Sequence, residues 1–207
     1  MFTVITSEIR WFIPGNVPEM VAAWFDAQGG NMISEPDRTD TYLVLPKTNN
    51  VGIKVRQGRV EIKKLIRNFG ETKISTNLSG YREMWQKWSF DVDPAGNLPL
   101  SFNLGTSQWS GISKKRKLFR FAIEINKLIP LQSESPFPEN GAHIELAEIS
   151  INSNNWWTFG VEAFGHENQL ENHLQLMLDQ GIKHPEFDVF LKKTSMSYPG
   201  WLSKLPG

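Results

Sequence analysis

The strongest constraint on the fold is an alternation of apolar and ionic side chains along residues 52–64. Lys54 and Arg56 alternate with the apolar Ile53 and Val55, and a similar alternation resumes after a Gln-Gly pair. Successive side chains on a β-strand point to opposite faces of the sheet. The segment therefore predicts a β-hairpin that has one apolar face and one ionic face. The ionic face is either solvated surface or the lining of a polar cavity.

Similar patterns predict strands elsewhere in the chain. Strands are expected at residues 4–12, 40–45, 81–91, 114–124, 143–151 and 158–164. The segment 81–91 also fits a helical turn that leads into a strand. Apolar spacing and the positions of Gly and Pro predict helices between residues 18 and 28, and at 167–180 and 186–193.

The order of these elements limits the fold class. Many strands, a few helices at their edges and no regular alternation of strand with helix favour a mainly antiparallel sheet or barrel. Charge along the middle of a strand is unusual in a sandwich core, but such a face can line the lumen of an open barrel. We therefore expect an α+β protein with one domain over residues 1–207, built as an antiparallel β-barrel, or tunnel, with flanking helices.

Composition excludes several classes of protein and site. A chain of 207 residues is long enough for one domain with a substantial core, and the absence of cysteine excludes disulfides and thiolate sites. The 22 basic and 22 acidic residues leave no net charge, so neither nucleic acid nor a membrane is expected as a partner. No apolar run approaches the roughly 18 residues of a spanning helix. The first residues lack the pattern of a signal peptide, so a cytoplasmic location is expected.

Five short motifs follow one another along the chain. In order, they are Thr6-Ser-Glu-Ile-Arg10, Asp40-Thr-Tyr42, Lys54-Val-Arg56, Glu61-Ile-Lys63 and Gly160-Val-Glu-Ala-Phe164. This series, with the helix and the Lys-Thr-Ser-Met-Ser-Tyr segment that follow it, resembles the CYTH-like domain, also called the triphosphate tunnel metalloenzyme superfamily. The resemblance spans essentially the whole chain. It implies a β-tunnel that binds a small phosphorylated anion: a triphosphate, a polyphosphate or a nucleotide.

The resemblance also implies a set of site residues. Those expected to bind the ligand are Arg10, Lys54, Arg56, Lys63 and Arg120. Arginine suits phosphate because its planar fork donates two parallel hydrogen bonds, and lysine adds a mobile point charge. Those expected to hold Mg²⁺ or Mn²⁺ are Glu8, Glu145 and Glu162. Hard cations of this kind prefer carboxylate oxygens, and the metal would support hydrolysis of a triphosphate. No catalytic residue is assigned.

Two positions depart from the family pattern. Thr6 stands where the first glutamate of an E-x-E-x-K strand is expected, and Phe164 stands where the second glutamate of a late E-x-E strand is expected. In catalytic members those acidic residues hold the metal opposite a basic wall. The departures are typical of a degenerate member that binds an anion without hydrolysing it, so hydrolysis and simple binding remain as alternatives.

Other interpretations compete with the tunnel. In one alternative, Glu61 balances its basic neighbours on a solvated face. The basic run at residues 114–117 fits a solvated strand entrance. A barrel that carries an apolar ligand or binds a protein partner predicts an aromatic lumen with the charged faces turned outward. Asp40 and Tyr42 are expected to define the fold, and the Trp pair at 156–157 is expected to pack at a barrel end.

Overall fold

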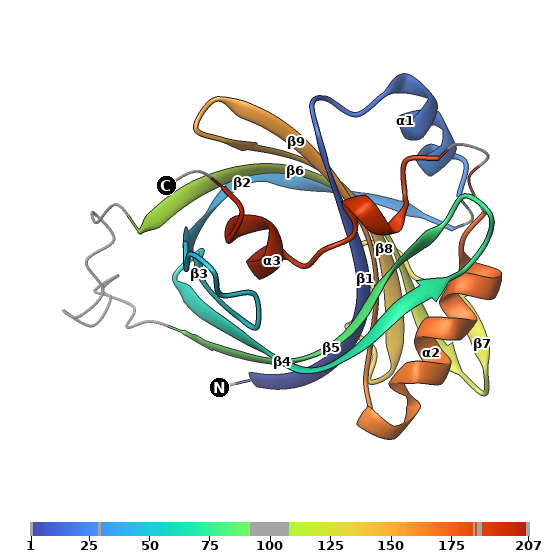
Figure 1. Cartoon of the computed structure of the whole chain (residues 1–207). Helices are drawn as coiled ribbons and strands as arrows, with labels where there is room; N and C mark the ends of the chain where they lie inside the picture. Colours follow the sequence, from blue (N-terminus) through green and yellow to red (C-terminus); the bar gives the residue numbers. More distant parts are fainter. Residues whose placement is uncertain (1, 29, 92–107, 184, 186–187, 206–207) are drawn as a thin grey trace.

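The protein is a closed β-barrel of eight antiparallel strands in a computed structural model that describes residues 2–28, 30–91, 108–183, 185 and 188–205 (Figure 1). Neighbouring strands follow the order β2-β3-β4-β5-β1-β9-β8-β6, and pairing of β2 with β6 closes the ring. The strands of the ring are β1 (Phe2–Pro14), β2 (Met32–Leu43), β3 (Val51–Arg56), β4 (Arg59–Lys73), β5 (Ser79–Asp91), β6 (Trp109–Glu124), β8 (Gly141–Ile151) and β9 (Asn154–Phe164). A short strand, β7 (Lys127–Pro130), pairs with β6 outside the ring. The expected fold class is confirmed.

All the predicted strands are present. The hairpin at residues 52–64 consists of β3 and the start of β4, joined at Gln57 and Gly58, which both have positive φ (47° and 75°) as a tight hairpin turn requires. The segment 81–91 is strand throughout, as part of β5. Strand β2 begins eight residues before the predicted start, because its first half pairs with β6.

The helices agree with the prediction except near the C-terminus. The first predicted helix is α1 (Glu19–Asp26). The predicted late helix is a continuous helical run that consists of a 3₁₀ turn (Glu167–Gln169), α2 (Leu170–Leu176) and a π-helical turn (Met177–Gly181). No helix of the described residues is long and apolar enough to cross a bilayer.

The helix predicted at residues 186–193 is wrong where it can be checked. Residues 186 and 187 lie outside the described part of the chain, and the chain turns after them. The backbone amide of Ser79 donates to the carbonyl oxygen of Phe190, which ties this segment to the barrel. The helical structure that follows begins with a 3₁₀ turn (Lys192–Thr194), which overlaps the predicted helix at Lys192 and Lys193. A short helix, α3 (Tyr198–Leu202), comes next, in a segment that the sequence analysis left without a helix.

The barrel wall separates two apolar clusters. The larger one lies on the outer face, where Ile9 and Trp11 of β1 pack with Val21 and Phe25 of α1 and with Leu174 of α2. The smaller one lies inside the ring. Its members include Phe12, Tyr42, Ile112, Ile149, Trp201 and Leu202. In Figure 1, α3 lies within the ring of strands, and this helix contributes Trp201 and Leu202 to the inner cluster.

Candidate ligand site in the barrel lumen

A cavity of about 640 Å³ occupies the lumen, and each of the eight ring strands contributes to its lining. Helix α3 forms part of the same lining through Tyr198, Pro199 and Leu202. The volume falls within the range of about 300–1,000 Å³ that is typical of small-molecule sites. The barrel therefore encloses a space that suits a small organic or inorganic ligand.

The cavity gathers positive charge. Nine cationic side chains line it: Arg10, Arg38, Lys54, Arg56, Arg59, Lys63, Lys87, Lys114 and Arg116. Four carboxylates line it: Glu8, Glu61, Glu145 and Glu162. The whole chain has equal numbers of basic and acidic residues, so this enrichment in cations belongs to the lumen.

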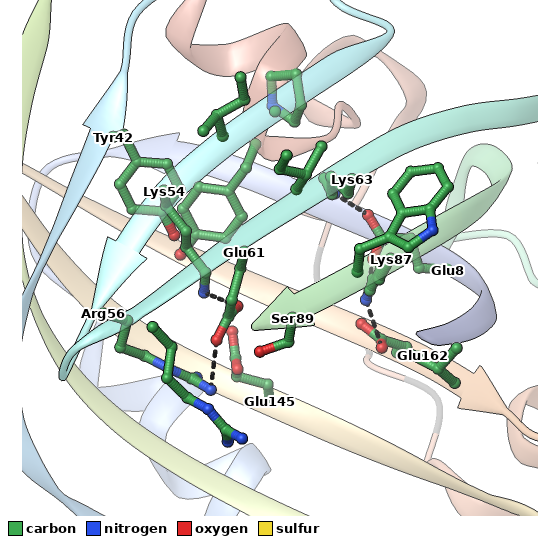
Figure 2. Close-up of a pocket in the computed structure, with 18 of the residues that line it drawn as sticks. Glu8, Tyr42, Lys54, Arg56, Glu61, Lys63, Lys87, Ser89, Glu145 and Glu162 are labelled. Atoms are coloured by element: carbon green, nitrogen blue, oxygen red, sulfur yellow. Dashed lines mark hydrogen bonds and ion pairs between the residues drawn. The ribbon is translucent and has the colours of Figure 1, made fainter. Parts of the chain in front are cut away.

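Glu8 and Glu162 are held by lysines from neighbouring strands (Figure 2). The Nζ of Lys63 lies 2.8 Å from one oxygen of Glu8, and the Nζ of Lys87 lies 3.6 Å from the other. Lys87 also donates to Glu162 at 2.6 Å. Burial by itself would raise the pKa of Glu8, but the two ammonium groups hold that pKa well below its usual value. Glu8 is therefore ionised and paired.

Glu145 is held by two guanidinium groups. Arg10 donates to its Oε1 at 2.6 Å, and the Nε of Arg116 donates to its Oε2 at 2.6 Å. Burial would raise the pKa of Glu145, but Arg116 and Arg10 keep it well below the usual range. Gly160 makes room for this arrangement, since a Cβ there would lie 2.6 Å from the guanidinium carbon of Arg10.

Asp40 is fully buried and lies beside three cations. Its oxygens lie 3.2 Å from the Nε of Arg38, 3.2 Å from the Nζ of Lys114 and 3.6 Å from the Nζ of Lys54. Lys54 also contacts Glu61 at 2.9 Å. Asp40 thus has the structural role expected from the sequence, and it also anchors the wall of the cavity.

Most carboxylates in this network pair with more than one cation, and positive charge remains in excess. Among the described residues, the ion pairs of the nine cations involve seven carboxylates. Besides the four in the lining, these are Glu35, Asp40 and Asp91. The nine cations therefore outnumber the carboxylates that pair with them by two.

Lys114 is the most buried amine of the cavity. Its Nζ donates to the hydroxyl oxygen of Tyr42 and lies 4.7 and 4.2 Å from the ring centroids of Tyr42 and Tyr198. Each such ring contact favours the ammonium by roughly 0.5–2 kcal/mol, whereas burial of an ammonium costs several kcal/mol. Burial and the neighbouring Lys54 together lower the pKa of Lys114 well below its usual value, although Asp40 opposes them.

Most of the predicted ligand-binding residues lie together, and one does not. Arg10, Lys54, Arg56 and Lys63 all line the cavity. Arg120 is absent from the lining among the described residues, which corrects the expectation that it shares the lumen. Its guanidinium instead donates to the backbone carbonyl oxygens of Gln132 and Ser133, at 2.9 and 2.8 Å, because the loop after β7 crosses over it.

The three predicted metal ligands, Glu8, Glu145 and Glu162, also line the cavity. Each is engaged by one or more cations, as described above. In the described ranges, no group of three or more His, Asp or Glu side chains is placed to hold a metal ion. In their present arrangement, these carboxylates neutralise lysine and arginine and do not form a metal site.

The two departures from the family pattern face each other. Thr6 of β1 and Phe164 of β9 are partners in the β1–β9 register, two positions from the Glu8–Glu162 pair. Thr6 is buried, and the ring of Phe164 stacks on Phe137 with centroids 4.5 Å apart. A buried hydroxyl and an aromatic contact therefore stand where the resemblance implies two further carboxylates.

Several lining residues escaped the sequence analysis. Lys114 and Arg116 were assigned to a solvated strand entrance, and Lys87 was not singled out. Lys114 and Arg116 lie on the same face of β6 as Arg120, which was expected to share the lumen. This shared face is the signal from which Lys114 and Arg116 could also have been assigned to the lumen. The alternative interpretation, a barrel that carries an apolar ligand, predicts charged faces that turn outward. In the structure, the ionic faces of β3 and β4 line the lumen.

Comparison with known proteins adds no further assignment. No family model matches the chain, and a search of curated proteins finds no significant match. The β-barrel is a property of the structure, and the CYTH-like resemblance stays a prediction from the sequence.

Proposed function

We propose that the barrel lumen binds a small phosphorylated anion, such as a triphosphate, a polyphosphate or a nucleotide. The observation that carries this proposal is the charge of the cavity. In the part of the chain that the structure describes, nine Lys or Arg side chains and four Glu line it, although the whole chain has zero net charge. Most of these cations are shielded from bulk solvent, so the attraction between the cationic wall and an anion is stronger than it would be in water.

The sharing of carboxylates provides the binding mechanism. Asp40 forms ion pairs with three cations, and Glu145 forms ion pairs with two arginines. Phosphate oxygens can supply the contacts that these cations lack, with the planar fork of arginine matching two oxygens at once. The ligand then adds counter-charge to cations that are already buried, so binding avoids most of their desolvation cost.

Two arginines are positioned to meet the ligand first. Arg56 and Arg59 are the most exposed of the nine cations, with side chains 29% and 47% exposed. The deeper cations, Arg10 and Lys114, are only 6% and 4% exposed. This gradient supports entry of the anion past the arginines and final contact with the buried groups.

Hydrolysis assisted by Mg²⁺ or Mn²⁺ is the second candidate, and it rests on the sequence resemblance. The carboxylates Glu8, Glu145 and Glu162 do not fit the metal as they stand, since each already forms an ion pair with lysine or arginine. We therefore propose binding without a metal held by the protein.

Thermal unfolding with sodium tripolyphosphate tests the proposal. A ligand at 100-fold above its dissociation constant stabilises the native state by about 2.7 kcal/mol, which corresponds to a rise in Tm of about 5–10 °C for a chain of this size. The parent protein should show this rise without added metal. Arg56→Ala should lose most of it, and Arg120→Ala, outside the cavity, should keep it.

The other outcomes decide between the candidates. A rise that appears only with Mg²⁺ or Mn²⁺ would favour the metal-dependent candidate. Equal rises in Tm in both variants would show that Arg56 does not contact the ligand. The absence of a rise in the parent protein, with tripolyphosphate or with ATP, would overturn the proposal.

A further inference from the structure

Lys114 has surroundings unlike those of the other lysines in the cavity. Its side chain is 4% exposed, compared with 16% to 25% for Lys54, Lys63 and Lys87. Those three each have a carboxylate oxygen within 2.9 Å of Nζ. The nearest carboxylate oxygen to Lys114 is 3.2 Å away, and it belongs to Asp40, which two other cations share.

The charged and titratable groups that face this amine come from five elements. They are Asp40 and Tyr42 of β2, Lys54 of β3, Arg116 of β6, Glu145 of β8 and Tyr198 of α3. Burial lowers the pKa of Lys114, and repulsion from Lys54 lowers it further. The lowered pKa gives Lys114 a larger neutral fraction than an exposed lysine has at the same pH, and the neutral amine is the nucleophile.

The geometry points to Lys114 as a reactive amine that forms an imine with an aldehyde or ketone ligand held in the lumen, with Tyr42 and Asp40 as its partners. Three observations support this site. The amine lines the cavity, the Tyr42 hydroxyl is in hydrogen-bond contact with it, and Asp40 is close enough to stabilise a positive charge on the nitrogen. This inference goes beyond anion binding and adds a covalent step to the same cavity.

The reaction balances without any other reagent. The nitrogen lone pair attacks the carbonyl carbon, the C=O π electrons move to oxygen, and a proton passes from nitrogen to oxygen to give a carbinolamine. Tyr42 then donates its proton to the hydroxyl, which leaves as water while the nitrogen lone pair forms the C=N bond. Asp40 lies beside the resulting iminium nitrogen, which returns its proton to Tyr42. Burial raises the pKa of Tyr42 well above its usual value, so its hydroxyl keeps a proton available for this step.

Borohydride trapping tests the inference. The full-length protein is incubated with pyridoxal 5′-phosphate at pH 7, reduced with sodium borohydride and digested, and the modified lysines are identified by mass spectrometry. We expect the adduct on Lys114 to form at least tenfold faster than on its exposed neighbour Lys115. Lys114→Arg, which keeps the charge, should lose that adduct while its labelling elsewhere is unchanged.

A second probe separates this inference from the proposed function. Pyridoxal, which lacks the phosphate, should also label Lys114 but more slowly if the cavity attracts anions. Equal rates with both probes would count against anion binding and leave the reactive amine intact. Tyr42→Phe should slow labelling about tenfold at pH 7 without moving it to other lysines. Labelling confined to exposed lysines, with Lys114 unmodified by either probe, would overturn the inference.

Discussion

The two faces of the barrel wall use the same strands in opposite ways. On the outer face, Ile9 and Trp11 of β1 pack against Phe159 and Val161 of β9 in an apolar core. On the inner face, one residue along, β1 presents Glu8 and Arg10 to the lumen. The outer face supplies hydrophobic stabilisation, whereas buried ion pairs contribute little net stability over apolar residues of similar size. The difference indicates that the outer face of the wall supplies most of the stability. The inner face around the cavity carries most of the charged side chains.

The largest effect is expected on the outer face. Trp11 is fully buried, stacks on Phe159 with ring centroids 5.6 Å apart, and donates its indole N–H to the carbonyl oxygen of Ser79. Trp11→Ala should lower the free energy of unfolding by about 3–5 kcal/mol because it leaves a large cavity. Urea unfolding followed by circular dichroism measures this. A loss below 1 kcal/mol would show that the outer face is not the main source of stability.

Removing one charge from the inner face should cost less, but for a different reason. Glu145→Gln keeps the shape of the side chain and leaves Arg10 without a carboxylate among the described residues. The loss should be about 3 kcal/mol, at the low end for a broken buried pair, because Arg116 keeps Glu35. The variant Glu145→Gln/Arg10→Met should recover part of the loss. If the double variant is as unstable as the sum of its single changes, the pair is not coupled.

Low pH should lower the stability of the protein through the ion pairs of the inner face. The folded-state pKa values of Glu8 and Glu145 lie below their usual values, so their contribution to stability is present above about pH 4.5 and is lost as pH falls toward the folded-state values. Stability should therefore decline steadily below pH 4.5. Glu8→Gln should flatten that decline, and Glu148→Gln, on the exposed outer face, should leave its slope unchanged. Equal slopes in all three proteins would contradict the assignment.

The smallest effect is expected at the rim of the lumen. Arg59 pairs with Asp91 at 2.7 Å, but both side chains are largely exposed. Arg59→Ala should change the free energy of unfolding by only about 0.2–1 kcal/mol, since solvent and salt screen such pairs. It should nevertheless weaken the Tm rise with tripolyphosphate. A stability loss comparable to that of Glu145→Gln would mean that the rim and the interior do not differ.

Much of the fold was predictable because strand alternation is a local property. The pattern of residues 52–64 identified a hairpin, and the same reasoning placed Glu8 with Arg10 and separated both from Trp11. The helix expected at 186–193 failed because that segment bonds to Ser79, a long-range contact that helical spacing cannot report. Helix α3 was not predicted because a five-residue segment that contains Pro and Gly resembles an irregular tail. The helix is stabilised by its packing inside the ring.

The site was only partly predictable for a related reason. Alternation shows which side chains share a face, but not how far along a tilted strand the cavity extends. Lys114, Arg116 and Arg120 all share one face of β6, yet the first two line the cavity while a loop covers the third. Their separation depends on the closure of the ring and on the path of the chain after β7.

Residue type and short-range spacing are enough to predict the strands, their two-faced character and the absence of net charge. Which face is enclosed, and which partners meet there, depends on how the strands assemble. The pairing of β2 with β6 closes the ring, and the pairing of β9 with both β1 and β8 brings Arg10 to Glu145, 135 residues away along the chain. Closure is a property of all eight strands together, so no single segment can encode it, and the charge of the lumen appears only when the ring is complete.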